Sequence, residues 1–125
     1  MDTSPEYIKM CEKAEEIQKD HEPHRWDLYY CDMNDLVYDY GTGFGPDGSD
    51  MHSCDIWLPR QDQLQDMLTW DRAYYPLSVL QDYVRTMLQK RDYYKQFLSM
   101  EQLWLALVME EKFNKTWNGE EWVKA

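Results

Sequence analysis

The chain has 125 residues, of which 13 are Lys or Arg and 24 are Asp or Glu, so its formal net charge is −11. This balance argues against direct binding to nucleic acids, which relies on basic side chains, and it disfavours anionic membranes as well. Aromatic residues make up 15% of the chain, more than an intrinsically disordered protein contains. The composition therefore predicts one compact domain over residues 1–125.

Neither a membrane span nor a signal peptide is expected. The longest apolar run, residues 103–109, has seven residues, far fewer than the roughly 20 that cross a bilayer. Residues 1–6 have no basic flank and no apolar stretch, so we expect a cytoplasmic protein. Cys11, Cys31 and Cys54 are odd in number, and in a reducing compartment free thiols are the default interpretation.

The N-terminal segment has the pattern of an amphipathic helix. Pro5 suits a first helical turn, and Thr3 and Glu6 have the spacing of a capping box. Apolar residues then recur at intervals of four and three, namely Tyr7, Cys11, Ala14 and Ile17. The breaker Pro23 follows shortly afterwards. We therefore expect one helix over residues 5–19.

From Trp26 the apolar period changes to two, which is typical of strands. Residues 26–31, 36–40 and 52–58 alternate in this way. The polar residues 32–35 predict a hairpin turn between the first two strands. The glycine-rich residues 41–48 predict a loop. Three antiparallel strands are expected from this half of the chain.

Helical spacing returns after Pro59. A short helix is predicted from residue 60 to about residue 70, and Pro76 opens the next one. The apolar stripe of that second helix is Leu80, Tyr83, Val84, Met87 and Leu88. With the first and last helices, this gives an α+β fold in which a small three-stranded antiparallel sheet is packed by about four helices.

The last helix begins at Ser99, whose spacing to Gln102 makes a second capping box. It is apolar almost all round, as expected for the central helix of a core or for a partner-binding element. Beyond it, Trp117 and Trp122 are costly to leave in water, so we expect the tail to dock back on the core.

Five side chains are plausible zinc ligands: His21, His24, Cys31, His52 and Cys54. Their spacings match no standard zinc finger. Pro23 also keeps the two nearest histidines from facing one another across a helical turn. We therefore expect neither metal nor cofactor. A metal-dependent enzyme or metal-binding protein that uses the His, Cys and Asp residues between His21 and Asp55 is the alternative.

No motif indicates catalysis. The glycine loop, residues 41–45, lacks the following helix and the lysine of a phosphate-binding loop. The acids around it lack the fixed register of an EF-hand; they are Asp39, Asp47, Asp50 and Asp55. There is no nucleophile elbow and no catalytic cysteine signature. The chain is therefore expected to be non-enzymatic.

Surface chemistry is the remaining signal. Aromatic side chains near the ends of elements are of the kind enriched at interfaces, and a polar cluster adjoins the predicted strand-to-helix junction at Pro59. The candidate interaction residues are Trp57, Arg60, Gln61, Asp62, Trp70, Tyr74 and Tyr75. They would contact a protein partner or a second copy of the chain.

Several segments resemble small uncharacterised proteins of bacteriophages and prophage regions in Firmicutes. They are residues 7–14 (YIKMCEKA), 56–67 (IWLPRQDQLQDM), 99–106 (SMEQLWLA) and 117–122 (WNGEEW). The resemblance spans nearly the whole chain and is weaker over the glycine loop and residues 81–95. It implies a phage or mobile-element origin and transfers no catalytic residue.

The leading hypothesis is thus an acidic phage or prophage accessory protein in the bacterial cytoplasm that acts through protein contact or self-association. DNA mimicry is a special case, which requires acidic side chains aligned on one face. Besides the metal-dependent alternative, a small-molecule binder with a pocket between the sheet and the last helix stays open.

Overall fold

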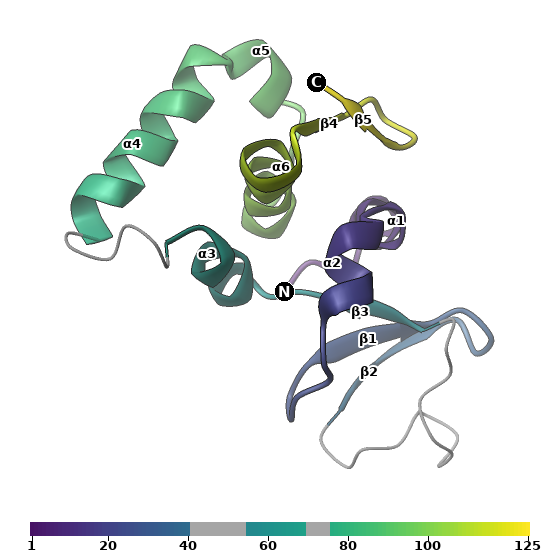
Figure 1. Ribbon diagram of the computed structural model, residues 1–125. Helices are drawn as coiled ribbons and strands as arrows, with labels where there is room; N and C mark the ends of the chain where they lie inside the picture. The colour runs from purple at the N-terminus through teal and green to yellow at the C-terminus, as the bar shows by residue number, and fades with distance from the viewer. Residues whose placement is uncertain (41–54, 70–75) are drawn as a thin grey trace.

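The computed structural model of the protein describes residues 1–40, 55–69 and 76–125 (Figure 1). This part of the chain forms six helices and five strands. The helices are α1 (Pro5–Lys13), α2 (Glu15–Asp20), α3 (Gln61–Thr69), α4 (Pro76–Gln89), α5 (Arg91–Tyr94) and α6 (Met100–Phe113). The strands are β1 (Leu28–Cys31), β2 (Leu36–Asp39), β3 (Ile56–Leu58), β4 (Lys115–Trp117) and β5 (Trp122–Lys124).

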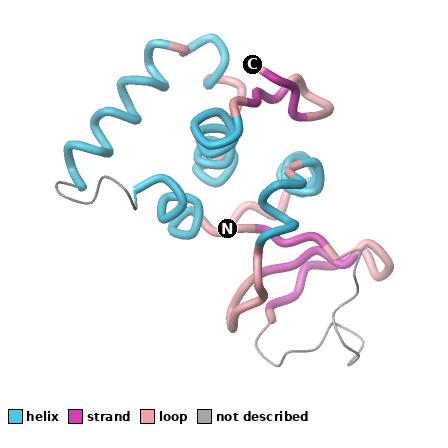
Figure 2. The backbone as a smooth tube through the Cα atoms, viewed as in Figure 1, coloured by secondary structure: helices cyan, strands magenta, loops and turns pink. Residues whose placement is uncertain are grey.

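The first three strands form one antiparallel sheet in the order β2-β1-β3, which confirms the predicted α+β class. Tyr29 in the central strand lies opposite Tyr38 of β2 and Trp57 of β3. Figure 2 shows this sheet at one end of the molecule and most of the helices at the other. No helix in the described ranges has the length and apolar character to span a membrane. The predicted glycine loop lies outside the described residues.

Helix α6 is the central element of the core, as its all-round apolar pattern predicts. Every residue from Trp104 to Met109 is buried. Figure 1 shows α6 in the middle of the helical part, next to α3 and to strand β4. The Ser99 hydroxyl caps its first turn by accepting from the Gln102 amide at 3.1 Å. Asn114, with φ of 55°, ends it in the left-handed conformation that is common at helix C-termini.

The C-terminal tail docks on the core, which confirms the expectation from its two tryptophans. It does so as a β4–β5 hairpin that the sequence analysis did not anticipate. Trp117 and Trp122 are buried, with ring centroids 5.0 Å apart. The Trp122 indole donates to the Met10 carbonyl at 2.9 Å, and that of Trp117 donates to Glu6 at 3.1 Å. Both bonds tie the hairpin to α1.

The prediction of one helix over residues 5–19 was wrong, because the helix breaks at Ala14 into α1 and α2. Ala14 has ψ of 68°, outside the helical region, and its side chain is fully buried. Propensity favours alanine inside a helix, so tertiary packing decides this break. The predicted Thr3–Glu6 capping box is replaced by Ser4, whose hydroxyl accepts from the Tyr7 amide at 3.2 Å.

Helix α4 buries less of its apolar stripe than the sequence pattern suggests. Val79, Tyr83 and Met87 face the core. Tyr83 holds the helix in place by donating to the Leu68 carbonyl at 2.9 Å and by packing its ring edge against Trp104. The predicted stripe residues Leu80, Val84 and Leu88 are exposed instead. The stripe is therefore split between a buried and an exposed face.

Asp2 joins the starts of α1 and α6. Its carboxylate accepts from the Ser4 amide at 2.8 Å, the Ser99 hydroxyl at 2.6 Å and the Gln102 amide nitrogen at 2.8 Å. Burial raises the pKa of Asp2, but these hydrogen bonds outweigh burial and hold it below the usual value. A carboxylate with a lowered folded-state pKa stabilises the fold above its unfolded pKa and stops doing so as the pH falls through the folded value.

We expect Asp2→Asn to lower the free energy of unfolding by about 1 kcal/mol at neutral pH, a modest figure because the carboxylate is partly exposed. The difference from wild type should shrink towards zero below the folded-state pKa. Urea denaturation at pH 7 and at acidic pH measures both. The control Glu12→Gln removes an exposed carboxylate of the adjoining helix. A wild-type advantage over Asp2→Asn that stayed constant with pH would contradict the assignment.

Candidate functional site

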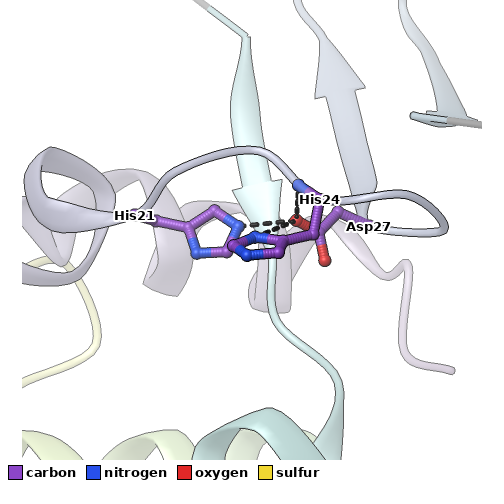
Figure 3. A group of neighbouring side chains, drawn as sticks. All are labelled: His21, His24 and Asp27. Atoms are coloured by element: carbon purple, nitrogen blue, oxygen red, sulfur yellow. Dashed lines mark hydrogen bonds and ion pairs between the residues drawn. The ribbon is translucent and has the colours of Figure 1, made fainter. Parts of the chain in front are cut away.

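The side chains of His21, His24 and Asp27 converge on the segment between α2 and β1 (Figure 3). Helix α2 ends at Asp20, and His21 has the extended backbone of the residue that follows. Pro23 keeps the chain out of the helical region, because the residue before a proline avoids it. The Asp27 amide then donates to the His24 carbonyl at 3.1 Å, which closes a four-residue turn.

Trp26 occupies the third position of this turn with φ of 73°. A positive φ is common there for glycine or asparagine but rare for a bulky side chain. The indole is 64% exposed, and the Trp26 carbonyl accepts from the Arg60 guanidinium at 3.1 Å. The period-two pattern predicted that Trp26 begins the first strand. The turn shortens that strand to β1 and leaves an exposed aromatic ring beside the cluster.

Asp27 is the centre of the site and is fully buried. Its Oδ2 accepts from His21 Nε2 at 2.7 Å and from the His24 amide at 2.8 Å. Its Oδ1 accepts from Gln63 Nε2 at 2.7 Å, and Arg60 Nη1 lies 3.8 Å away. A buried carboxylate requires such partners, because an unpaired one is very costly. Gln63 on α3 and Arg60 directly before α3 thus complete the site whose other residues lie between α2 and β1.

The charges of this pair follow from its surroundings. Burial raises the pKa of Asp27, but the hydrogen bonds from the His24 amide, His21 and Gln63 outweigh it and hold the pKa below its usual value. Burial lowers the pKa of His21, and its contacts with Asp27 only partly offset this. At neutral pH the site therefore holds an aspartate anion and a neutral imidazole whose Nε2 carries the proton.

His21 is held from a second side by Trp57. The two rings are stacked, with centroids 3.4 Å apart and planes 1° from parallel. The Trp57 backbone is fixed in turn by the Gln18 side chain, which donates to its carbonyl at 2.8 Å and accepts from its amide at 2.9 Å. The imidazole is therefore oriented before any ligand arrives.

His24 lies on the open side of the cluster. Its side chain is 70% exposed, and its Nδ1 donates to the Glu22 carbonyl at 2.5 Å. An open cleft of about 550 Å³ borders it, lined among others by His21, Arg60 and Gln63. A small ligand entering this cleft would meet both imidazoles and the guanidinium groups of Arg25 and Arg60.

The structure unites residues that the sequence analysis kept in separate groups. His21 and His24, considered as metal ligands, lie next to Trp57 and Arg60, considered as interaction residues. Trp57 is buried, and its ring packs against His21. Gln61 and Asp62 begin α3, and Asp62 accepts from Arg60 Nε at 3.1 Å.

The other candidates lie elsewhere. Cys31 is buried in β1, where it accepts a weak hydrogen bond from Asn34 at 3.5 Å, and it does not belong to the histidine cluster. The remaining candidates lie outside the described residues; they are His52, Cys54, Trp70, Tyr74 and Tyr75.

Of the site residues, Asp27 was included only in the general alternative of His, Cys and Asp residues between His21 and Asp55, and Gln63 was missed. Asp27 extends the His21 and His24 spacing by a further three residues, and that regular interval was the available signal. Gln63 gave no local signal, because it reaches the site only through the packing of α3. Its Oε1 accepts from the Arg60 amide at 2.9 Å while its Nε2 donates to Asp27.

Comparison of the chain with protein-family models, with curated proteins and with solved structures finds no match.

Proposed function

We propose that this protein is a non-enzymatic accessory protein of phage or prophage origin that works in the bacterial cytoplasm by pairing with a second copy of itself. The observation that supports the pairing is a row of exposed apolar side chains on α4. Leu77, Leu80, Val84 and Leu88 are 79%, 40%, 43% and 61% exposed. Exposed apolar patches on monomeric proteins mark contact sites more often than single exposed residues do.

The spacing of this row suits a helix pair. Intervals of three, four and four residues keep the side chains on one narrow side of a helix, the arrangement of a two-helix seam. The buried residues of α4 lie on another side and hold it to its own core. In Figure 1, α4 lies along the outside of the helical part, and the exposure of its row leaves these side chains open to a second copy.

Charge favours a second copy as the occupant. Helix α4 itself contains one basic side chain, Arg85, and one acidic side chain, Asp82, so it is neutral in a chain of −11. Two copies repel one another over most of their surface. The repulsion is least where α4 meets α4, and a two-fold axis there pairs the same row with itself.

Sedimentation equilibrium over a range of protein concentrations tests the proposal. We expect wild-type protein to form dimers, and Val84→Glu with Leu88→Glu to shift the chain to monomers that keep the wild-type circular dichroism spectrum, because both side chains lie outside the core of the single chain. Leu98→Glu is the matched control, since Leu98 is 89% exposed but lies between α5 and α6. A wild-type chain that stays monomeric at every concentration, or a control that dissociates equally, would contradict the proposal.

A further inference from the structure

A second site, independent of the α4 row, is formed by the three side chains of Figure 3. Ring nitrogens of His21 and His24 and a carboxylate oxygen of Asp27 all lie within 4.8 Å of one another. Two imidazoles and one carboxylate form a donor set that zinc takes in proteins, with bonds of about 2.0–2.2 Å. We propose that His21, His24 and Asp27 bind one zinc ion.

The supporting contacts have the form found around metal ligands. Oδ2 of Asp27 is the oxygen that faces the two histidines, while Oδ1 is held by Gln63. The His21 ring is fixed by its stacking on Trp57. Hydrogen bonds and packing of this kind orient ligands in metal sites. The donor atoms of His21 and Asp27 therefore have little freedom to lose when an ion binds, whereas the exposed His24 supplies the adjustable ligand.

Binding requires the proton on each ligating nitrogen to move to the other nitrogen of its ring. In His24, Nδ1 lies 4.0 Å from Asp27 Oδ2 and now donates to the Glu22 carbonyl, so ligation through Nδ1 breaks this bond and places the proton on Nε2. The corresponding shift takes place in His21. Its Nε2 now donates to Asp27 over 2.7 Å. In the zinc form Nε2 supplies its lone pair to the ion and the imidazole proton resides on Nδ1, so the ring stays neutral. The two donor atoms then separate to about 3.4 Å, the spacing of two ligands around a tetrahedral zinc. The exposed His24 side chain can adjust to this change.

The fourth position opens onto the cleft of about 550 Å³. Three protein ligands leave one position of a tetrahedral zinc ion for a ligand from solution. Arg60 Nη1 lies 3.8 Å from the far oxygen of Asp27 and lines the same cleft. This positive charge opposes the ion itself but favours a small anion, such as a carboxylate or a phosphate, as the fourth ligand.

Titration of metal-free protein with Zn²⁺ against a chromophoric chelator tests the site. We expect one ion per chain, and binding weakened at least about 100-fold in His24→Ala, because losing a ligand exceeds the roughly 10–100-fold cost of losing a supporting group. Gln63→Leu should weaken binding about 10-fold. His52→Ala is the matched histidine control and should bind as wild type does.

Three results would overturn the proposal: equal affinity in wild type and His24→Ala, zinc lost in His52→Ala, or a thiolate charge-transfer band in the Co²⁺-substituted protein, which would assign the ion to cysteine. Because the His24 side chain is exposed, we expect His24→Ala to fold as wild type does. Circular dichroism of the metal-free protein checks this. The oligomeric state is measured separately, so failure of this site and failure of the α4 contact are distinguishable.

Discussion

Replacing Asp27 with alanine is expected to lower the free energy of unfolding by about 3 kcal/mol. The reason is that the carboxylate is fully buried and accepts three hydrogen bonds, two of them from His21 and Gln63. Removing one member of a buried charged network leaves the remaining polar groups without partners, at a cost of roughly 3–5 kcal/mol in the strongest cases. Denaturant unfolding of the metal-free protein at pH 7 measures the loss.

Two further variants distinguish the contribution of the Asp27 charge from that of its buried position. Asp27→Asn keeps the shape of the side chain but replaces one acceptor oxygen with an amide donor that faces other donors. We therefore expect the free energy of unfolding to fall by about 1–2 kcal/mol. Asp62→Ala removes the other acidic side chain beside Arg60. Because the Asp62 side chain is 68% exposed, we expect this change to lower the free energy of unfolding by less than about 1 kcal/mol. Equal losses from the Asp27 and Asp62 alanine variants would show that the buried network does not stabilise the fold.

We expect Trp122→Ala to lower the free energy of unfolding by about 3–5 kcal/mol, the range for truncation of a buried aromatic residue. Its ring packs on Trp117 and its indole N–H bonds to the Met10 carbonyl, so the change both opens a cavity and leaves a buried acceptor unpaired. Thermal and urea denaturation measure the loss. Because the hairpin contacts α1, we expect the whole domain to unfold at the lower midpoint.

A conservative variant divides this effect. Trp122→Phe keeps most of the ring but removes the N–H donor, and it should cost about 1–2 kcal/mol for the unpaired Met10 carbonyl and the lost volume. Trp26→Ala is the control, since this exposed indole should change stability by no more than about 0.5 kcal/mol. If Trp122→Ala matched Trp26→Ala, the tail would not be part of the cooperative unit.

The fold was largely predictable from local patterns. Period-two alternation identified the three strands, and the all-round apolar character of α6 identified the centre of the core. The breaks were not predictable in the same way. Ala14 interrupts a helix against its own propensity, and the exposure of Leu88 depends on which side of α4 meets the core. Both are decided by packing between distant segments.

The candidate site was predictable only in part. His21 and His24 stood out by residue type, and Pro23 was correctly expected to keep them off a shared helical turn. The extended segment and turn that bring them together instead were not foreseen. The supports arrive from 36 residues further on, as with Gln63 and Asp27. No pattern within one element encodes a contact of that kind.

The two hydrogen bonds between the Gln18 side chain and the Trp57 backbone affect how this protein can aggregate. Among the described residues, β3 is an outer strand of the sheet, and such strands offer free backbone groups that recruit strands from other chains. One glutamine amide occupies both backbone groups of Trp57, the middle residue of β3. The backbone of Trp57 therefore has no free N–H or C=O group for a strand of another chain, and this protects the edge of the sheet against edge-to-edge aggregation.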